Sequence, residues 1–303
     1  MSLRALRTLV AIAQCGSLGR AAEAVGLTQS AVSLHVRALE QEFRISLFDR
    51  SRRQLVLTDA GRTAVVRARE ILALYDGIAS ELADGGELAG RLRIGAIQTA
   101  LAGPLPDAMA TLRTAHPRLR IHVASGMSAE LAGRLDMGEI DAAITTEPVK
   151  PHPAGLVAMR LYQEGFWVVA PPGATERDAS RLLQEWPFIR FDRRVWAGRI
   201  IDQELRRMRL RVDGDVELDS REGILRMVAA GLGVAIVPLS EVARAALGPL
   251  TCLPFGDPQR HRWVVLLERE DRPAHRLACA LAEAVRLAAT DIGMPAPPAD
   301  PEG

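Results

Sequence analysis

The chain is 303 residues long and almost neutral, with 38 Lys plus Arg against 37 Asp plus Glu. No stretch approaches the roughly 18 consecutive apolar residues of a membrane span, so the sequence excludes a spanning helix and we expect no membrane partner. The three cysteines form no Cys-x-x-Cys pair and leave an odd count, which fits a reducing cytoplasm and predicts a cytoplasmic location.

Charge is unevenly distributed along the chain. Residues 1–62 contain nine arginines and five acidic residues, a net charge of +4 in a chain whose total is +1. The remainder therefore carries about −3. This asymmetry is typical of one nucleic-acid-binding end attached to a body that does not bind nucleic acid.

Two short helices joined by a tight turn are predicted between residues 17 and 43. Ser17 can cap the first helix, and Gly26 can end it in the left-handed conformation that glycine adopts without a Cβ penalty. Thr28 can cap the second helix. Apolar residues recur along this second helix at spacings of four, three and four and predict a stripe that faces a core: Val32, Val36, Leu39 and Phe43.

The outer face of the second helix is polar. We expect Gln29, Ser30, Ser33 and Arg37 on this face, together with Ser17, to contact double-stranded DNA, because these side chains can reach base edges and phosphates. The alternative is the solvated face of an ordinary amphipathic helix, which contains the same residue types.

Residues 45–58 read as a β-hairpin. Leu55 and Leu57 point one way, and Arg50, Arg52 and Arg53 lie near the turn. Guanidinium groups at a hairpin tip suit phosphate contact or insertion into a minor groove. The pattern therefore predicts a DNA-binding wing.

Residues 6–61 resemble the winged helix-turn-helix of the LysR-type transcriptional regulators. The matching residues are Gly16-Ser17, Ala21-Ala22, Gln29-Ser30-Ala31-Val32-Ser33, Leu39-Glu40, Leu47-Phe48-Asp49-Arg50 and Leu57-Thr58-Asp59-Ala60-Gly61. Two positions depart from the family: Leu9 stands where Phe is usual, and Arg44 stands where Gly usually ends the second helix. Arg44 must adopt the left-handed conformation, at roughly 1 kcal/mol, or end the helix differently.

A helix is predicted from residue 58 onward, with an apolar seam formed by Val65, Ala68, Leu72, Tyr75, Ala79 and Leu82. The resemblance implies that this helix pairs two subunits into a dimer, or a dimer of dimers. Because the seam is shorter than a convincing coiled coil, packing against the chain's own body is the alternative. Gly85, Gly86 and Gly90 then mark a domain boundary.

Short apolar runs alternate with helical stretches from residue 91 onward, which indicates an α/β body. The predicted strands are 92–97, 121–124, 141–145, 166–170, 188–191, 216–218, 234–237 and 263–267. The resemblance covers this body too and implies a two-lobed α/β effector-binding domain, similar to type 2 periplasmic binding proteins, that the chain crosses twice.

The expected architecture is therefore a multi-domain chain of α+β and α/β parts. We expect a winged helix-turn-helix at 1–58, a linker helix at 59–88, an effector-binding domain at 91–291 and a disordered tail at 292–303. Within the effector-binding domain, lobe I covers about 91–161 and 267–291, and lobe II covers about 162–266.

Polar residues follow the ends of several predicted strands and could line a cleft. Hydroxyl groups beside unpaired backbone N–H groups suit a carboxylate, and an arginine on the second lobe could pair with it, so we expect an organic anion as small-molecule effector. The candidate residues are Gln98, Thr99, Met127, Ser128, Thr145, Thr146, Phe191 and Arg193. Helix capping and surface ion pairs are the alternative roles of these residues.

The sequence gives little support to an enzyme. It contains no His-Glu-x-x-His pair, nucleophile elbow or P-loop, and Gly231-Leu232-Gly233 lacks the third glycine of a dinucleotide site. We therefore expect no catalytic residue, metal or cofactor. A solute-binding or enzymatic α/β body with an incidental helix-turn-helix is one alternative, and redox control through Cys252 and Cys279 is another. The resemblance also leaves room for contact with RNA polymerase.

Overall fold

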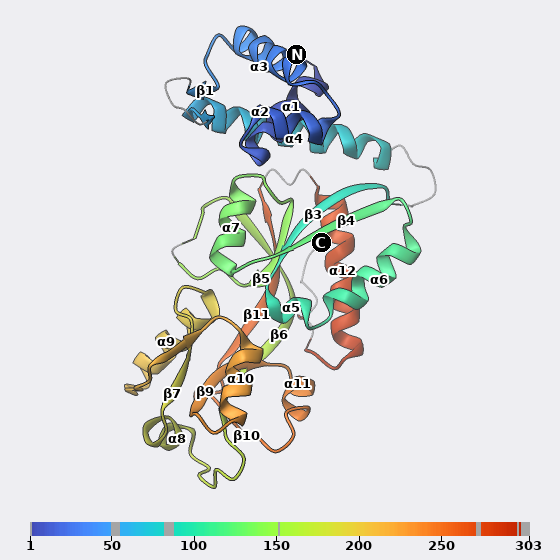
Figure 1. Ribbon diagram of the computed structural model, residues 1–303. Helices are drawn as coiled ribbons and strands as arrows, with labels where there is room; N and C mark the ends of the chain where they lie inside the picture. Colours follow the sequence, from blue (N-terminus) through green and yellow to red (C-terminus); the bar gives the residue numbers. More distant parts are fainter. Residues whose placement is uncertain are drawn as a thin grey trace. The chain divides into compact units, whose positions relative to one another are not determined.

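The computed structural model describes residues 2–49, 55–81, 88–150, 152–270, 274–295 and 297. The chain divides into two compact units, one of Met1–Gly90 with Met137–Glu139 and one of Arg91–Asp136 with Ile140–Gly303. Each unit has its own core of buried apolar side chains. Figure 1 shows the helices and strands of both units. No described helix is long and apolar enough to cross a membrane.

The first unit is a small helical bundle with a two-stranded hairpin. Its elements are α1 (Leu3–Cys15), α2 (Leu18–Val25), α3 (Gln29–Phe43), β1 (Phe48–Asp49), β2 (Val56–Leu57) and α4 (Asp59–Glu81). Strands β1 and β2 are antiparallel, with Phe48 opposite Leu57 and Asp49 opposite Val56. The predicted hairpin is confirmed, and Leu55 and Leu57 both pack against the core of this unit.

Local signals set the ends of α2 and α3 as the sequence predicts. The Ser17 hydroxyl accepts a hydrogen bond from the backbone N–H of Arg20 at 3.2 Å, and Thr28 does the same for Ala31. Gly26 ends α2 at a φ of 65°. Arg44 ends α3 in the left-handed conformation at a φ of 55°, so a non-glycine residue occupies a position that favours glycine.

The apolar stripe of α3 ends sooner than its spacing predicts. Val32, Val36 and Leu39 are buried, but Phe43 is 40% exposed, so its assignment to the core is wrong. Phe43 is the last residue of α3, where the helix has passed the core. Leu47 and Phe48, which follow the turn, are buried in that core instead.

The first part of the α4 seam packs inside its own unit. Val65 and Ala68 are 4% and 1% exposed and belong to the core that α1, α2 and α3 form, and Leu72 is partly buried against it. Tyr75 is 49% exposed. Ala79 and Leu82 lie outside the side chains that the structure describes. Val65 and Ala68 are therefore unavailable to a partner subunit, because α1 covers them.

The second unit is built on a mixed nine-stranded sheet in the order β4-β3-β5-β11-β6-β9-β7-β8, with β10 paired to β6. Its strands are β3 (Gly90–Ala96), β4 (Leu119–Ser125), β5 (Ala142–Thr146), β6 (Leu156–Ala170), β7 (Phe188–Phe191), β8 (Val216–Leu218), β9 (Val234–Leu239), β10 (Thr251–Pro254) and β11 (His261–Arg269). The predicted strands are all present, but the first ten residues of β6 and all of β10 were not predicted.

Two long strands join the lobes. Strands β6 and β11 are antiparallel and pair from His261 opposite Gly165 to Arg269 opposite Leu156. Strand β11 also pairs with β5 of lobe I, and β6 also pairs with β9 of lobe II. The chain therefore passes twice between the lobes within one continuous sheet.

Helices cover the sheet on both lobes (Figure 1). They are α5 (Gln98–Leu101), α6 (Leu105–Ala115), α7 (Ser128–Asp136), α8 (Ala179–Glu185), α9 (Trp196–Arg207), α10 (Arg221–Ala229), α11 (Glu241–Ala245) and α12 (His275–Asp291). Helix α12 packs on α6 and β6, α7 packs on β5, and α10 packs on β7 and β9. Helices α5 and α7 begin shortly after β3 and β4, so their first residues lie at the same edge of the sheet.

The ordered chain extends past residue 292, where the sequence predicts a disordered tail. Met294 is 8% exposed, and the Pro295 carbonyl oxygen accepts a hydrogen bond from the Gln163 backbone N–H at 3.1 Å. Residues 296 and 298–303 lie outside the described residues.

Candidate functional site

The outer face of α3 presents the predicted polar side chains. Gln29, Ser30 and Arg37 are exposed, and Ser33 is half-buried. Ser30 shares a hydrogen bond with the capping hydroxyl of Thr28 at 2.9 Å. These residues lie together because positions three, four and seven apart share one side of a helix. Ser17 lies at the start of α2, where its hydroxyl caps that helix.

A contact on the inner side fixes α3 against α1. The His35 Nδ1 atom lies 2.8 Å from the hydroxyl oxygen of Thr8, which is 1% exposed. Together with the buried residues of the α3 stripe, this hydrogen bond turns the polar face outward. One side chain on that face differs in character, because Leu34 is 65% exposed. Sequence analysis did not single out Leu34, although its position between Ser30 and Arg37 places it there.

The tip of the predicted wing, with Arg50, Arg52 and Arg53, lies outside the described residues. The base of the wing is described. Arg62 at the start of α4 donates a hydrogen bond to the Leu57 carbonyl oxygen and forms an ion pair with Asp59. This hydrogen bond links β2, the second strand of the hairpin, to the first turn of α4.

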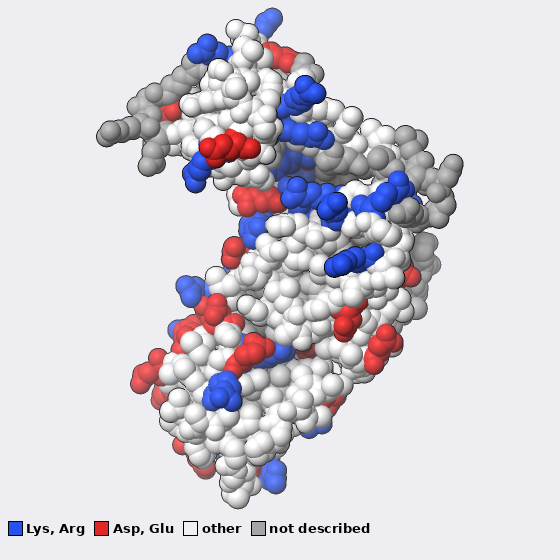
Figure 2. Space-filling model, turned by 45° about the vertical axis from the view of Figure 1, so that its right-hand side comes forward, with Lys and Arg blue, Asp and Glu red and all other residues white. Residues whose placement is uncertain are grey.

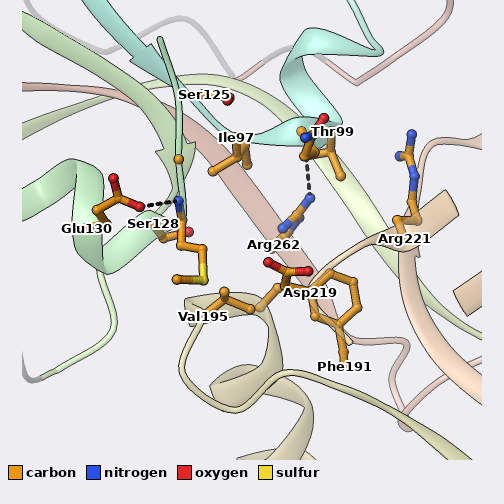
Figure 3. Close-up of a pocket in the computed structure, with 14 residues that line it drawn as sticks. Ile97, Thr99, Ser125, Ser128, Glu130, Phe191, Val195, Asp219, Arg221 and Arg262 are labelled. Carbon is orange, nitrogen blue, oxygen red and sulfur yellow. Dashed lines mark hydrogen bonds between the residues drawn. The ribbon is translucent and has the colours of Figure 1, made fainter. Parts of the chain in front are cut away.

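A pocket of about 290 Å³ lies between the two lobes of the second unit, where α5, α7 and α9 begin (Figure 3). On the face drawn in Figure 2, acidic and basic side chains lie together between these lobes. The lining residues come from five separate segments of the chain: Ile97, Gln98, Thr99, Ser125, Gly126, Met127, Ser128, Glu130, Phe191, Val195, Ala197, Asp219, Arg221 and Arg262.

Arg262 on β11 is the central cation of the pocket. Its side chain is 2% exposed, and its Nε and Nη2 atoms donate to Glu164 Oε2 at 2.9 and 2.6 Å. Nη2 also donates to the Thr99 hydroxyl at 2.9 Å, and Nη1 donates to the Thr146 hydroxyl at 2.8 Å. Four of the five guanidinium N–H groups are thus used, which leaves one on Nη1 for another acceptor.

A second arginine lies close to the same carboxylate. Arg221, at the start of α10, is 11% exposed, and its Nη1 atom is 3.9 Å from Glu164 Oε1. Arg221 also donates to Glu222, whose side chain is 54% exposed and so largely screened by solvent. Two guanidinium groups therefore lie beside the buried carboxylate of Glu164. The more exposed carboxylates of Asp219 and Glu130 also line the pocket, so its lining holds charges of both signs.

The start of α7 adds hydrogen-bonding capacity. Ser128 is 3% exposed and lines the pocket, and its hydroxyl forms no hydrogen bond with another described residue. The Glu130 carboxylate lies 3.5 Å from the Met127 backbone N (Figure 3). Glu130 thus takes the Met127 N–H, and the other N–H groups at the start of α7, with the Ser128 hydroxyl, can donate to an anion.

The structure separates the predicted effector-binding residues into two groups. Gln98, Thr99, Met127, Ser128 and Phe191 line the pocket. Thr145, Thr146 and Arg193 do not.

Thr145, Thr146 and Arg193 have other contacts or positions that keep them out of the pocket. Thr145 and Thr146 are fully buried in β5, and the hydroxyl group of Thr146 serves Arg262. Arg193 is 57% exposed and pairs with Glu217, to which its backbone N–H also donates at 2.9 Å. The hydrogen bonds from Arg193 lower the pKa of the Glu217 carboxyl below its usual value. Arg193 is thus engaged by a local partner away from the pocket.

Sequence reasoning missed Arg262, Arg221 and Glu164. Glu164 on β6 and Arg262 on β11 are brought together by the pairing of these two strands. Arg221 is the first residue of α10, which packs on β6. One signal in the sequence could have identified Arg262: it is a charged residue directly before the apolar run 263–267.

Cys252 and Cys279 lie in different lobes of the second unit. Cys252 is on β10 and packs against the lobe II core, and burial raises the pKa of its thiol. Cys279 is on α12, where its Sγ atom lies 3.4 Å from His275 Nε2. Among the described residues, no group of His, Cys, Asp and Glu side chains could hold a metal ion.

Sequence families match both units. Residues 3–62 match the bacterial regulatory helix-turn-helix protein, lysR family, and residues 85–289 match the LysR substrate binding domain. Similar proteins include a "Probable RuBisCO transcriptional regulator" of Cyanidioschyzon merolae, 31% identical, with 80% of this chain and 83% of the relative covered.

Two further likenesses span nearly the whole chain. A "Probable hydrogen peroxide-inducible genes activator" of Streptomyces viridosporus is 30% identical, with 94% of this chain and 95% of the relative covered. The solved structure of a full-length OxyR variant from Pseudomonas aeruginosa has a TM-score of 0.72 and 28% identity, with 95% of each chain covered. The chain belongs to the LysR family of DNA-binding transcriptional regulators.

Proposed function

We propose that this regulator responds to a small organic anion bound in the pocket between the lobes. The observation that carries the proposal is that two guanidinium groups, those of Arg262 and Arg221, line one pocket, and that the hydrogen bonds of Arg262 with the described residues leave one of its N–H groups for a further acceptor. An anionic ligand would accept charge-assisted hydrogen bonds from these guanidinium groups. Ser128 and the N-terminus of α7 would hold the ligand from the opposite side.

A panel of metabolites tests the ligand class. Carboxylates, phosphates and neutral compounds are screened by the shift in melting temperature of the full chain, because a ligand at 100 times its Kd stabilises the folded state by about 2.7 kcal/mol. An anion is expected to raise the melting temperature in a saturable manner. If only neutral, apolar compounds do so, the proposed ligand chemistry is wrong.

Matched variants then locate the ligand. Arg221→Gln and Ser128→Ala should each weaken binding in calorimetric titration, by about 1–3 kcal/mol for each lost hydrogen-bond partner. Arg193→Gln removes an arginine that lies outside the pocket and should leave the ligand Kd unchanged. If Arg193→Gln and Arg221→Gln lose the same ligand affinity, the ligand does not bind in this pocket.

We also propose how DNA is bound. Helix α3 enters the major groove, where Gln29, Ser30, Ser33 and Arg37 contact bases and phosphates, with Ser17 close to the backbone. The wing arginines Arg50, Arg52 and Arg53 contact the phosphates or the minor groove. Because the chain acts on DNA, we place its action in the cytoplasm, and we assign it no catalytic step.

Self-association through α4 is the third part of the proposal. Three apolar side chains of α4, Leu74, Tyr75 and Ile78, are 61%, 49% and 48% exposed, which makes this side of the helix suitable for a partner subunit. Ile78→Asp should therefore shift the protein toward monomer in light scattering. Leu72→Asp should have a smaller effect on association, because Leu72 already packs against its own unit. An unchanged oligomer in Ile78→Asp would place the interface elsewhere.

Redox control remains the second candidate, supported by the likeness to the peroxide-inducible activator. The pKa of the Cys252 thiol is raised by burial, which lowers the fraction of reactive thiolate. We therefore expect DNA affinity to be the same with and without a reducing agent. A reductant-dependent affinity that is lost in Cys252→Ser or Cys279→Ser would favour the redox candidate.

A further inference from the structure

Leu34 is the most exposed large apolar side chain of the first unit's described residues, at 65%, and it lies on the outer face of α3. At 100° per residue, Leu34 lies about 40° from Ser30 and about 60° from Arg37 around the helix axis. It lies about 160° from the buried Val36, so it points away from the core. Its neighbours on this face are hydrogen-bonding side chains. A leucine in this position contributes nothing to the core of its own unit and exposes apolar surface to water.

The surroundings of Leu34 restrict what can cover it. Arg37 is exposed beside it, and Gln29 and Ser30 are exposed one turn before it. These side chains favour a polar, anionic partner, as DNA is. In the major groove the thymine C5-methyl is the apolar group that distinguishes one base pair from another. A leucine among polar residues therefore matches a thymine methyl among hydrogen-bonding base edges.

We propose that Leu34 is a specificity-determining residue that contacts a thymine methyl in each half of the DNA site. This inference rests on the proposed entry of α3 into the major groove. Arg37 and the polar residues would fix the position of α3 by hydrogen bonds, and Leu34 would then discriminate thymine from cytosine by contact with the methyl group. The exposed Phe43 and Ile45 lie at the other end of α3 and take no part in this contact.

Replacement of thymine by uracil tests the contact, because it removes the methyl group and keeps every hydrogen-bonding group of the base. A DNA site is first selected from a random duplex library with the full-length wild-type protein. Each thymine of that site is then replaced in turn by deoxyuridine, and the Kd is measured for wild type and for Leu34→Ala. One replacement in each half-site should weaken wild-type binding by about fourfold, from about 0.8 kcal/mol per buried methyl or methylene group. The same replacement should leave the Kd of Leu34→Ala unchanged.

Two further variants keep the test decisive. Leu232→Ala makes the same change at a 57% exposed leucine of the second unit and should keep the wild-type response to uracil. Leu34→Gln should shift the selected base at that position from thymine toward adenine, because an amide can bond to adenine N6 and N7. Such a gain of preference cannot come from loss of folding.

Three results would overturn the inference. In the first, no uracil replacement changes the wild-type Kd. In the second, Leu34→Ala keeps the wild-type sensitivity to uracil. In the third, Leu34→Ala changes the oligomeric state while uracil has no effect, which would show that another copy of the chain covers Leu34. Failure of the wild type to select any DNA sequence would instead refute the proposed DNA binding by α3, and this inference with it.

Discussion

Helix α3 and the pocket between the lobes bring their candidate side chains together in different ways. On α3, the candidate residues lie within nine positions of one helix and are mostly exposed. In the pocket, they come from five segments between Ile97 and Arg262, and the central arginine is 2% exposed. The proposed DNA-binding face is thus formed by one helix alone, whereas the pocket depends on strand pairing across the sheet of the second unit.

This difference predicts different costs of mutation. An exposed side chain on α3 contributes to binding and little to folding, so its removal should affect DNA and leave stability unchanged. A buried arginine with several partners contributes to both, because its removal leaves a carboxylate without its counter-charge. The four tryptophans, at positions 167, 186, 196 and 263, all lie in the second unit, so their fluorescence reports on that unit alone.

The largest effect is expected at Arg262. Arg262→Met leaves Glu164 buried with its main partner removed, and we expect a loss of about 3–5 kcal/mol in the free energy of unfolding. Denaturant titration followed by tryptophan fluorescence measures this loss. The double variant Arg262→Met with Glu164→Leu should recover much of it, because a well-packed apolar pair often replaces a buried ion pair without cost. A single variant that loses less than about 1 kcal/mol would show that the network is not structural.

Arg37 should show the opposite behaviour. Arg37→Ala is expected to weaken binding to a selected DNA site by about 1–3 kcal/mol, and to weaken binding to random DNA less, because base contacts carry specificity. The unfolding transition should not change. Arg113→Ala, at an exposed position on α6 of the second unit, is the control. Equal losses on selected and random DNA would remove Arg37 from the base-reading face.

Much of the first unit could be predicted from the sequence because its signals are local. Ser17, Gly26 and Thr28 set helix ends through contacts within three or four residues, and all three do so in the structure. Phe43 was assigned wrongly, because spacing alone cannot tell where the core ends. The wing tip lies outside the described residues, so the roles of its arginines stay predictions.

The pocket could be predicted only in part. Gln98, Thr99, Met127, Ser128 and Phe191 line it because they follow strand ends or begin helices, which the sequence pattern shows. Arg262 and Glu164 were missed, because they lie within strands β11 and β6 and meet only through sheet pairing over a long sequence separation.

Each unit contains an arginine in the left-handed backbone conformation, so the effect of relieving this strain can be compared between the units. Arg44 in the first unit and Arg209 in the second have positive φ angles of 55° and 57°. Replacement of either by Gly should stabilise its own unit by up to about 1 kcal/mol, because glycine avoids the Cβ penalty. Hydrogen exchange with mass spectrometry on the full chain should show slower exchange in residues 29–49 for Arg44→Gly and not for Arg209→Gly. Faster exchange in Arg44→Gly would mean that the arginine side chain stabilises this turn.

The smallest effect is expected from Asp192, which is 2% exposed at the end of β7. Hydrogen bonds from the Arg194 side chain hold the pKa of the Asp192 carboxyl below its usual value. A lowered pKa in the folded state gives stability above the ordinary value of about 3.9 that is lost as the pH falls through the folded pKa. Asp192→Asn should therefore lower the melting temperature at pH 7, and its difference from wild type should narrow below about pH 4. A melting-temperature difference between Asp192→Asn and wild type that does not vary with pH would contradict this account of the Asp192–Arg194 pair.

The most direct test of the account is whether the pocket and the DNA-binding unit are coupled. The Kd of the full chain for its selected DNA site is measured with and without the anion that stabilises it, and the Kd for the anion is measured with and without DNA. If the pocket is regulatory, the anion changes DNA affinity by some factor, and linkage requires DNA to change anion affinity by the same factor. Arg221→Gln should reduce anion binding and leave the DNA Kd without anion unchanged. Two affinities that do not depend on each other would show that the pocket binds its ligand without controlling DNA binding.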